Sequence, residues 1–181
     1  MGKSVAESFL RERGVPVVDT DALARQLAEP GQPALDEIRQ AFGAEVLAQD
    51  GHLRRDELAR RVFKDEGARR KLEGILHPRI RMLWQQQIEL WANENRPVAV
   101  VVIPLLFETG AESEFDETIC IACTGGTQQE RLLGRGWSEA EIEQRIRAQL
   151  PIEKKMEKAD YVIWNEGPLD VLAGQLGVIL P

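Results

Sequence analysis

Gly2-Lys3-Ser4, followed by a helical segment and the apolar run Val15-Pro16-Val17-Val18, is the part of the sequence that decides the fold. The three residues match the end of the phosphate-binding loop G-x-x-x-x-G-K-[ST], whose backbone N–H groups and lysine bind nucleotide phosphates while its hydroxyl binds Mg²⁺. Helical spacing over residues 5–10, with Gly14 as a cap, gives the order loop, helix, strand. Because three common residues also occur together by chance, the interpretation depends on the rest of the chain.

Two carboxylates, Asp19 and Asp21, come directly after this strand. In an open parallel sheet, side chains at the carboxyl ends of strands lie beside phosphates that are bound at a helix N-terminus. The sequence therefore places a carboxylate pair where phosphoryl transfer needs one. Asp21 also has a second interpretation, as the N-cap of a helix that begins at Ala22.

The composition sets broad bounds. The 181 residues are 43% hydrophobic, which fits one core domain with a small inserted subdomain. The formal net charge of −7 argues against nucleic acid as the main partner, because nucleic-acid-binding surfaces are usually basic. No stretch resembles a signal peptide or reaches the roughly 18 apolar residues of a membrane helix, so we expect a cytoplasmic protein.

Cys120 and Cys123 are the two cysteines, in a C-x-x-C spacing. A zinc or redox site would need a second pair of ligands or a helix N-terminus at the first cysteine. The two histidines, His52 and His77, are distant in sequence, and residues 118–122 have the pattern of a buried strand. We interpret both cysteines as small buried side chains.

The rest of the sequence alternates between helices and strands, without internal repeats. Residues 22–27 have a helical pattern, as does a long region over 33–95 that is interrupted near Gly43 and at Asp50-Gly51. Continuous apolar runs predict buried parallel strands, and a capping box from Ser138 to Glu141 marks a helix start. The expected strands cover 98–103, 118–122 and 161–164, and the expected later helices cover 127–135 and 138–149, with one more at the end.

Several short motifs are spread over nearly the whole chain. They are Gly2-Lys3-Ser4, Val17-Val18-Asp19-Thr20-Asp21, Ala24-Arg25-Gln26, Glu29-Pro30-Gly31, Phe42-Gly43, Asp50-Gly51, Leu76-His77-Pro78, Pro104-Leu105-Leu106-Phe107-Glu108, Gln129-Glu130-Arg131, Arg135, and Asp160-Tyr161-Val162-Ile163 with Asn165 and Gly167. None is specific alone. In this order they resemble the motifs of dephospho-CoA kinase, a family that uses ATP to phosphorylate the 3′-hydroxyl of the dephospho-CoA ribose.

The resemblance implies an α/β fold with a P-loop NTPase-like parallel sheet and flanking helices, a helical substrate-binding insertion and a lid. The nucleotide-binding core is expected in residues 1–32 and 96–181, including a lid over about 125–150, and the insertion of the acceptor site in residues 33–95. The central first strand of such a sheet and the leading glycines of the loop are missing from the sequence. We therefore expect this chain alone to bind ATP weakly.

The resemblance also implies roles for the charged residues. Asp21 is expected to be the general base that takes the proton of the attacking hydroxyl. Lys3 is expected to act on the transferred phosphate and Ser4 to hold Mg²⁺, while Asp19 either holds Mg²⁺ through water or orients the loop. Arg131 is expected to stabilise the developing phosphate charge from the lid.

Arg131 and Arg135 lie four residues apart, on one face of the helix expected over 127–135. Forked guanidinium groups match phosphate oxygens, so the resemblance implies that both arginines bind ATP from the lid. The alternative is solvated surface charge, which the nearby acids Glu130, Glu139 and Glu141 would favour.

The remaining contacts are implied by the resemblance alone, with ATP and Mg²⁺ as cofactors. The expected cofactor-binding residues are Gly2, Lys3, Ser4, Val5, Arg135, Asn165 and Gly167, and the expected acceptor-binding residues are His77, Leu105 and Leu106. His77 is alternatively a structural residue beside a helix kink at Pro78. Trp84 and Trp91 are interpreted as core packing.

Three other functions are compatible with the sequence. Another P-loop kinase, for a nucleoside or nucleotide, would share the core and the lid. A nucleotide-binding module without catalysis fits the shortened loop. A structural or interaction protein would have its Gly-Lys-Ser by chance, and would show no Mg²⁺-dependent nucleotide binding.

Overall fold

The computed structural model describes residues 2–180, and it divides the chain into two compact units. The first unit consists of Met1–Val15 and Ile103–Pro181, and the second of Pro16–Val102. Both contain parallel strands with flanking helices, so the predicted α/β class is confirmed. The sequence-based division at residues 32 and 96 assigns parts of the chain by role, and it stays a prediction.

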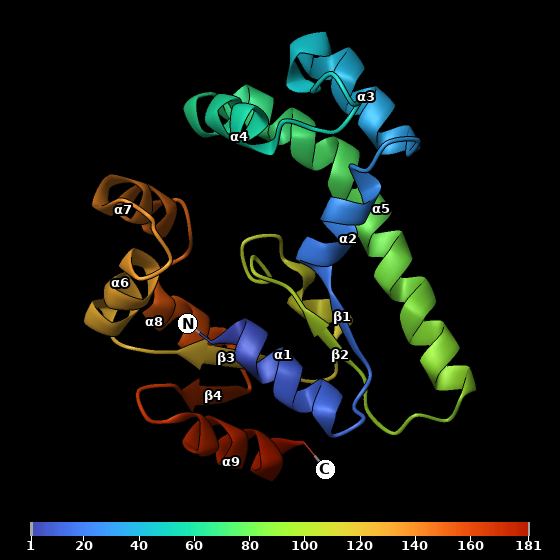
Figure 1. The fold of residues 1–181 in the computed structure, drawn as a ribbon. Helices are drawn as coiled ribbons and strands as arrows, with labels where there is room; N and C mark the ends of the chain where they lie inside the picture. Colours follow the sequence, from blue (N-terminus) through green and yellow to red (C-terminus); the bar gives the residue numbers. More distant parts are fainter. Residues whose placement is uncertain (1, 181) are drawn as a thin grey trace. The chain divides into compact units, whose positions relative to one another are not determined.

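The second unit is built on one long helix (Figure 1). Helix α5 (Glu66–Asn93) has α2 (Thr20–Leu27), α3 (Pro33–Phe42) and α4 (Arg55–Lys64) packed against it. Asp65 caps α5, because its Oδ1 accepts hydrogen bonds from the N–H groups of Gly67 and Ala68 at 2.7 and 3.2 Å. The core of this helical group is formed by Ile38, Val46 and Leu58.

Two short parallel strands complete the second unit. Strand β1 (Val17–Asp19) pairs with β2 (Val100–Val102), with Val17 opposite Val100. The apolar run over 98–103 predicts a longer, fully buried strand, and this expectation is wrong: β2 has three residues, all half-buried. Within residues 2–180, β2 pairs with β1 alone, so the other edge of β2 has no paired strand beside it and the strand is less buried.

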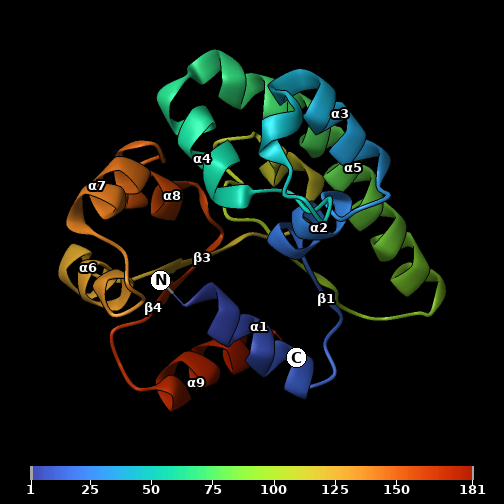
Figure 2. The same cartoon turned by 45° about the horizontal axis from the view of Figure 1, so that its top comes forward.

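The first unit packs two helices together with a second parallel pair (Figure 2). Strand β3 (Ile119–Ala122) pairs with β4 (Tyr161–Trp164), with Ile119 opposite Tyr161. Helix α1 (Lys3–Glu12) lies beside α9 (Leu169–Ile179). Their contact residues form one core with the strands, around Ala6, Ile163, Leu172 and Leu176. The strand predicted over 161–164 is confirmed at both ends.

Three shorter helices lie between β3 and β4 along the chain. They are α6 (Gly125–Leu133), α7 (Glu139–Arg147) and α8 (Ile152–Lys158). The capping box at the start of α7 is confirmed, because Ser138 and Glu141 each bind the backbone of the other. Helix α8 is absent from the sequence prediction. The buried residue of α8 is Lys155. A prediction of buried positions from apolar residues alone places a lysine at the surface.

Helix α6 ends two residues earlier than the sequence predicts. The N–H groups of Gly136 and Trp137 donate to the carbonyls of Leu133 and Leu132 at 2.9 and 3.3 Å, and Gly136 has a φ of 84°. This left-handed glycine closes the helix. Arg135 therefore lies in the turn after α6, and the expectation that it shares a helix face with Arg131 is wrong.

Both cysteines are buried, as the sequence predicts, and both are free thiols. Trp84 is buried in α5 and Trp91 is half-buried, which supports their interpretation as packing residues. No helix within residues 2–180 has the length and apolar content to cross a membrane.

The core of the first unit generates a stability prediction. Ile163 is fully buried, whereas Val178 on α9 is 87% exposed. Ile163→Ala should lower the free energy of unfolding by about 2–5 kcal/mol, because it removes buried methyl groups and leaves a cavity. Val178→Ala serves as the control and should leave that energy nearly unchanged. Urea denaturation of the two variants checks this, and equal midpoints would contradict the assigned core.

Candidate active site

The predicted phosphate-binding residues stand at the start of α1. Gly2 is the N-cap residue, with φ 108° and ψ 4°, a left-handed conformation that favours glycine. A Cβ atom at position 2 would collide with the Nδ2 atom of Asn165. Lys3 and Ser4 follow in the first turn, where backbone N–H groups have no partner within the helix. This end of α1 has the local chemistry of an anion site.

Asn165 connects this helix start to the end of β4. Asn165 is only 5% exposed, and its backbone N–H donates a hydrogen bond to the carbonyl of Ala122 at 2.7 Å. The carbonyl of Asn165 in turn accepts a hydrogen bond from Nη1 of Arg131 at 3.0 Å. Three of the predicted residues, Gly2, Asn165 and Arg131, are thus brought together within the first unit.

Lys3 lies close enough to β3 to affect the thiol of Cys120. Burial raises the pKa of this thiol, while the positive charges of Lys155 and Lys3 act in the opposite direction. Burial is the largest cause, so the net pKa lies above that of an ordinary cysteine. Cys120 therefore stays protonated at neutral pH and has no features of a reactive or metal-binding thiolate.

Glu166 is a site residue that the sequence analysis missed. Its Oε1 accepts a hydrogen bond from the N–H of Thr124, and its Oε2 accepts one from Oγ1 of Thr127 at 2.7 Å. These bonds hold the pKa of Glu166 below its usual value. The bond from the Thr124 N–H has the largest effect, and the charge of Arg131 adds a smaller one. The sequence signal is an acid shortly after a strand end, but nothing in the sequence pairs it with residues 124–127.

The two predicted acids are in the second unit, at the junction of β1 and α2. Oδ1 of Asp19 accepts a hydrogen bond from the N–H of Asp21 at 3.0 Å, and its Oδ2 lies 3.7 Å from Nη2 of Arg25. Asp19 is thus the N-cap of α2, and Asp21 is an exposed residue in its first turn. The alternative interpretation, in which Asp21 caps a helix that begins at Ala22, is wrong.

The predicted acceptor-binding residues do not fall within one unit. His77 is exposed on α5 beside Pro78, in the second unit. Leu105 and Leu106 are half-buried in the first unit, in the turn after β2, and both of their carbonyls accept a hydrogen bond from Oγ1 of Thr109. Gly167 lies in the turn before α9, where a Cβ atom would approach Val171 to 3.3 Å.

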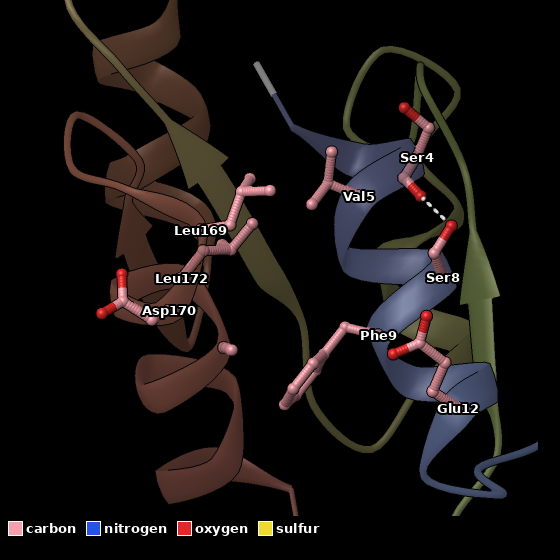
Figure 3. Close-up of a pocket in the computed structure, with 9 residues that line it drawn as sticks. Ser4, Val5, Ser8, Phe9, Glu12, Leu169, Asp170 and Leu172 are labelled. Atoms are coloured by element: carbon pink, nitrogen blue, oxygen red, sulfur yellow. Dashed lines mark hydrogen bonds between the residues drawn. The ribbon is translucent and has the colours of Figure 1, made fainter.

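A groove of about 510 Å³ runs between α1 and α9 in the first unit (Figure 3). Val5 and Phe9 on α1 point toward Leu169 and Leu172 on α9. Ser4 also lines the groove, and its carbonyl accepts a hydrogen bond from Oγ of Ser8 at 3.1 Å. None of the described lining residues is a lysine or arginine, so the groove has no positive side chain to bind phosphate.

The two predicted metal ligands are oxygen donors of the kind that Mg²⁺ prefers: the hydroxyl of Ser4 in the first unit and the carboxylate of Asp19 in the second. In the part of the chain that the structure describes, no three His, Cys, Asp or Glu side chains gather as a metal cluster. Mg²⁺ keeps several waters and binds through few protein ligands together with substrate phosphates, so a serine hydroxyl and one carboxylate are suitable donors for it.

Comparison with known proteins gives a consistent result. The family model for dephospho-CoA kinase matches residues 1–170. A dephospho-CoA kinase of Anaeromyxobacter dehalogenans is 46% identical over 180 residues, which cover 99% of this chain and 85% of that protein. One from Bdellovibrio bacteriovorus is 43% identical, over 91% of this chain and 82% of that protein.

Solved structures are also similar to this chain. A crystal structure of a protein from Thermus thermophilus matches with a TM-score of 0.84 and 35% identity, covering 99% of this chain and 90% of that one. Dephospho-CoA kinase from Campylobacter jejuni matches with a TM-score of 0.72 and 26% identity over the same shares of the two chains. From its motifs, its fold and these matches, the chain belongs to the dephospho-CoA kinase family.

Proposed function

We propose that this chain transfers the γ-phosphoryl group of ATP to the ribose 3′-hydroxyl of dephospho-CoA, the last step of CoA synthesis. The observation that carries the proposal is the family match over residues 1–170, which includes both the Gly2-Lys3-Ser4 motif and the acids after β1. Membership of this family makes the protein an ATP- and Mg²⁺-dependent kinase. The family match does not favour the two alternatives, another nucleotide kinase or a nucleotide-binding module without catalysis. The cytoplasmic location and the lack of a nucleic-acid partner stay predictions.

In this proposal the start of α1 binds the phosphates of ATP. The backbone at Gly2 and Val5, the ammonium of Lys3 and the positive end of the helix all attract negative charge. Ser4 and Asp19 would hold Mg²⁺, which neutralises charge on the transferred phosphate. Arg135 and the loop at Asn165 and Gly167 would bind the rest of the nucleotide. His77, in the insertion over 33–95, and Leu105 and Leu106, after β2, would contact the acceptor.

Asp21 is the proposed general base. It is exposed in the first turn of α2, and the capping of that helix is already done by Asp19. The Asp21 carboxylate therefore does not serve as the N-cap of α2. A carboxylate suits the role because the ribose hydroxyl loses its proton as its oxygen bonds to phosphorus.

Asp21→Asn should lower kcat for dephospho-CoA phosphorylation by about 10²–10⁴, because the amide cannot take the proton. ATP affinity should stay nearly unchanged. Asp36→Asn is the matched control, since Asp36 is an exposed acid in the first turn of α3, and it should keep full activity. Coupled assays with dephospho-CoA, measured beside ATP titrations, check this; a normal turnover of Asp21→Asn would remove Asp21 from the mechanism.

Arg131 is the proposed source of positive charge in the lid, the hairpin formed by α6 and α7. Its guanidinium is already directed to the end of β4, where it donates to the carbonyl of Asn165. Arginine retains further N–H groups for phosphate oxygens when one is used in this way. Such a group stabilises the transition state more than the bound substrates.

Arg131→Ala should slow phosphoryl transfer by about 10³ or more while the KM for dephospho-CoA changes little. Arg147→Ala is the control, because Arg147 is an exposed arginine of the same hairpin that pairs with Glu143. Steady-state kinetics with both substrates varied separate the two effects. A raised KM for dephospho-CoA at unchanged kcat would instead assign Arg131 to the acceptor pocket.

The proposed fold also includes a further parallel strand, which is expected to be central. Within residues 2–180, β2 pairs only with β1, and β3 pairs only with β4. A further parallel strand paired at an open edge would satisfy the backbone groups that remain there. The glycine-rich loop after such a strand would add N–H groups to those at Gly2.

An N-terminal extension that carries an apolar strand and a glycine-rich loop should therefore tighten ATP binding and raise activity. At a net gain of about 1 kcal/mol for each hydrogen bond formed, several new backbone bonds also increase the stability of the sheet. ATP affinity and dephospho-CoA phosphorylation should be measured for the chain with and without the extension. Equal values for the two forms would contradict the central strand.

A further inference from the structure

The α6–α7 hairpin is weakly attached to the rest of the first unit along its length. Helix α6 has no buried residue, and α7 buries only Ile142. A segment with few buried apolar contacts opens and shifts at low cost. The position of the hairpin is therefore set mainly by its two ends, and a carboxylate lies at each of them.

At the first end, Glu166 binds the start of α6 with both of its oxygens. Oε1 accepts from the N–H of Thr124, the N-cap residue, and Oε2 accepts from the hydroxyl of Thr127. Oγ1 of Thr124 also accepts from the N–H of Thr127 at 3.2 Å. A negative charge at a helix N-terminus is stabilised by the helix dipole, and its hydrogen bonds are charge-assisted.

At the second end, Glu108 binds the residues that follow α7. Its Oε1 accepts from the N–H of Leu150 at 2.9 Å and lies 2.7 Å from Nζ of Lys155. The side chains of Glu108 and Lys155 are only 17% and 8% exposed. Nζ of Lys155 also donates to Oε1 of Gln149 at 3.2 Å, so the pair fixes two successive residues after the hairpin. Breaking one partner of such a buried pair is costly.

We propose that Glu166 and Glu108 are positioning residues that hold the two ends of the α6–α7 hairpin and so direct Arg131 to the ATP site. The inference rests on the proposed function in that the hairpin is taken to cover ATP. The geometry at the first end supports the link, because Arg131 binds the carbonyl of Asn165, the residue next to Glu166. The hairpin and the loop after β4 are thus joined at both the first and the second turn of α6.

Glutamine is the sharpest substitution at both positions. It keeps the size of the side chain and one carbonyl oxygen but removes the negative charge. Glu166→Gln therefore replaces the charge-assisted bonds to Thr124 and Thr127 with neutral ones, and Glu108→Gln removes the charge that pairs with the ammonium of Lys155. Glu143→Gln is the matched control, because Glu143 is a 64% exposed acid in the middle of α7, where it pairs with Arg147.

Site-resolved amide hydrogen exchange is the first measurement, and it requires no substrate. The Thr124 N–H should exchange about tenfold faster or more in Glu166→Gln, and the Leu150 N–H should do so in Glu108→Gln, since each loses a charged acceptor. Glu143→Gln should change neither. Thr127→Val, which removes only the hydroxyl bound to Glu166, is a milder second variant and should accelerate exchange at Thr124 to a smaller extent. Unchanged exchange at both amides would overturn the proposal.

Kinetics test the positioning role separately. The kcat should fall about tenfold in both glutamine variants, while the KM for dephospho-CoA should stay within about twofold, because a displaced Arg131 stabilises the transition state less. Faster exchange with an unchanged kcat would show that the two acids are structural only. A wild-type chain that does not phosphorylate dephospho-CoA would contradict the proposed function instead, and the exchange result would still decide whether the two carboxylates hold the hairpin.

Discussion

The close approach of Gly2 to Asn165 is the constraint on which the rest of the candidate site depends. Position 2 needs a left-handed backbone and has no space for a Cβ atom, so only glycine fits without strain. This contact joins the first turn of α1 to the end of β4. Because Asn165 also binds Arg131 and is followed by Glu166, the α6 helix is placed through the same junction. A side chain at position 2 would therefore disturb the start of α1, the end of β4 and the placement of α6 together.

Features that depend on local sequence could be predicted well. Strand β4, the glycine that ends α1 and the capping box of α7 were all visible, because each rests on a few adjacent residues with a known backbone preference. The burial of the two cysteines followed from the apolar strand around them. The family could be predicted for a different reason, since it depends on the order of many weak motifs along the chain.

Features that depend on contacts between distant residues could not be predicted. Helix α8 buries Lys155 because Glu108, from a remote part of the sequence, supplies the opposite charge, and no local pattern shows that pairing. Glu166 was missed for the same reason. The end of α6 is a different case: Gly134 and Gly136 were present in the sequence, but only the hydrogen bonds to Leu132 and Leu133 show where the helix stops and why Arg135 lies beyond it.

Helix α5 has a mechanical consequence for the second unit. Its 28 residues extend over roughly 42 Å at 1.5 Å per residue, and α2, α3 and α4 all pack against it. The chain then passes through a short segment directly into β2, while α2 follows directly from β1. Asp19 and Asp21 stand where β1 joins α2, so any shift of α2 against α5 would move both acids.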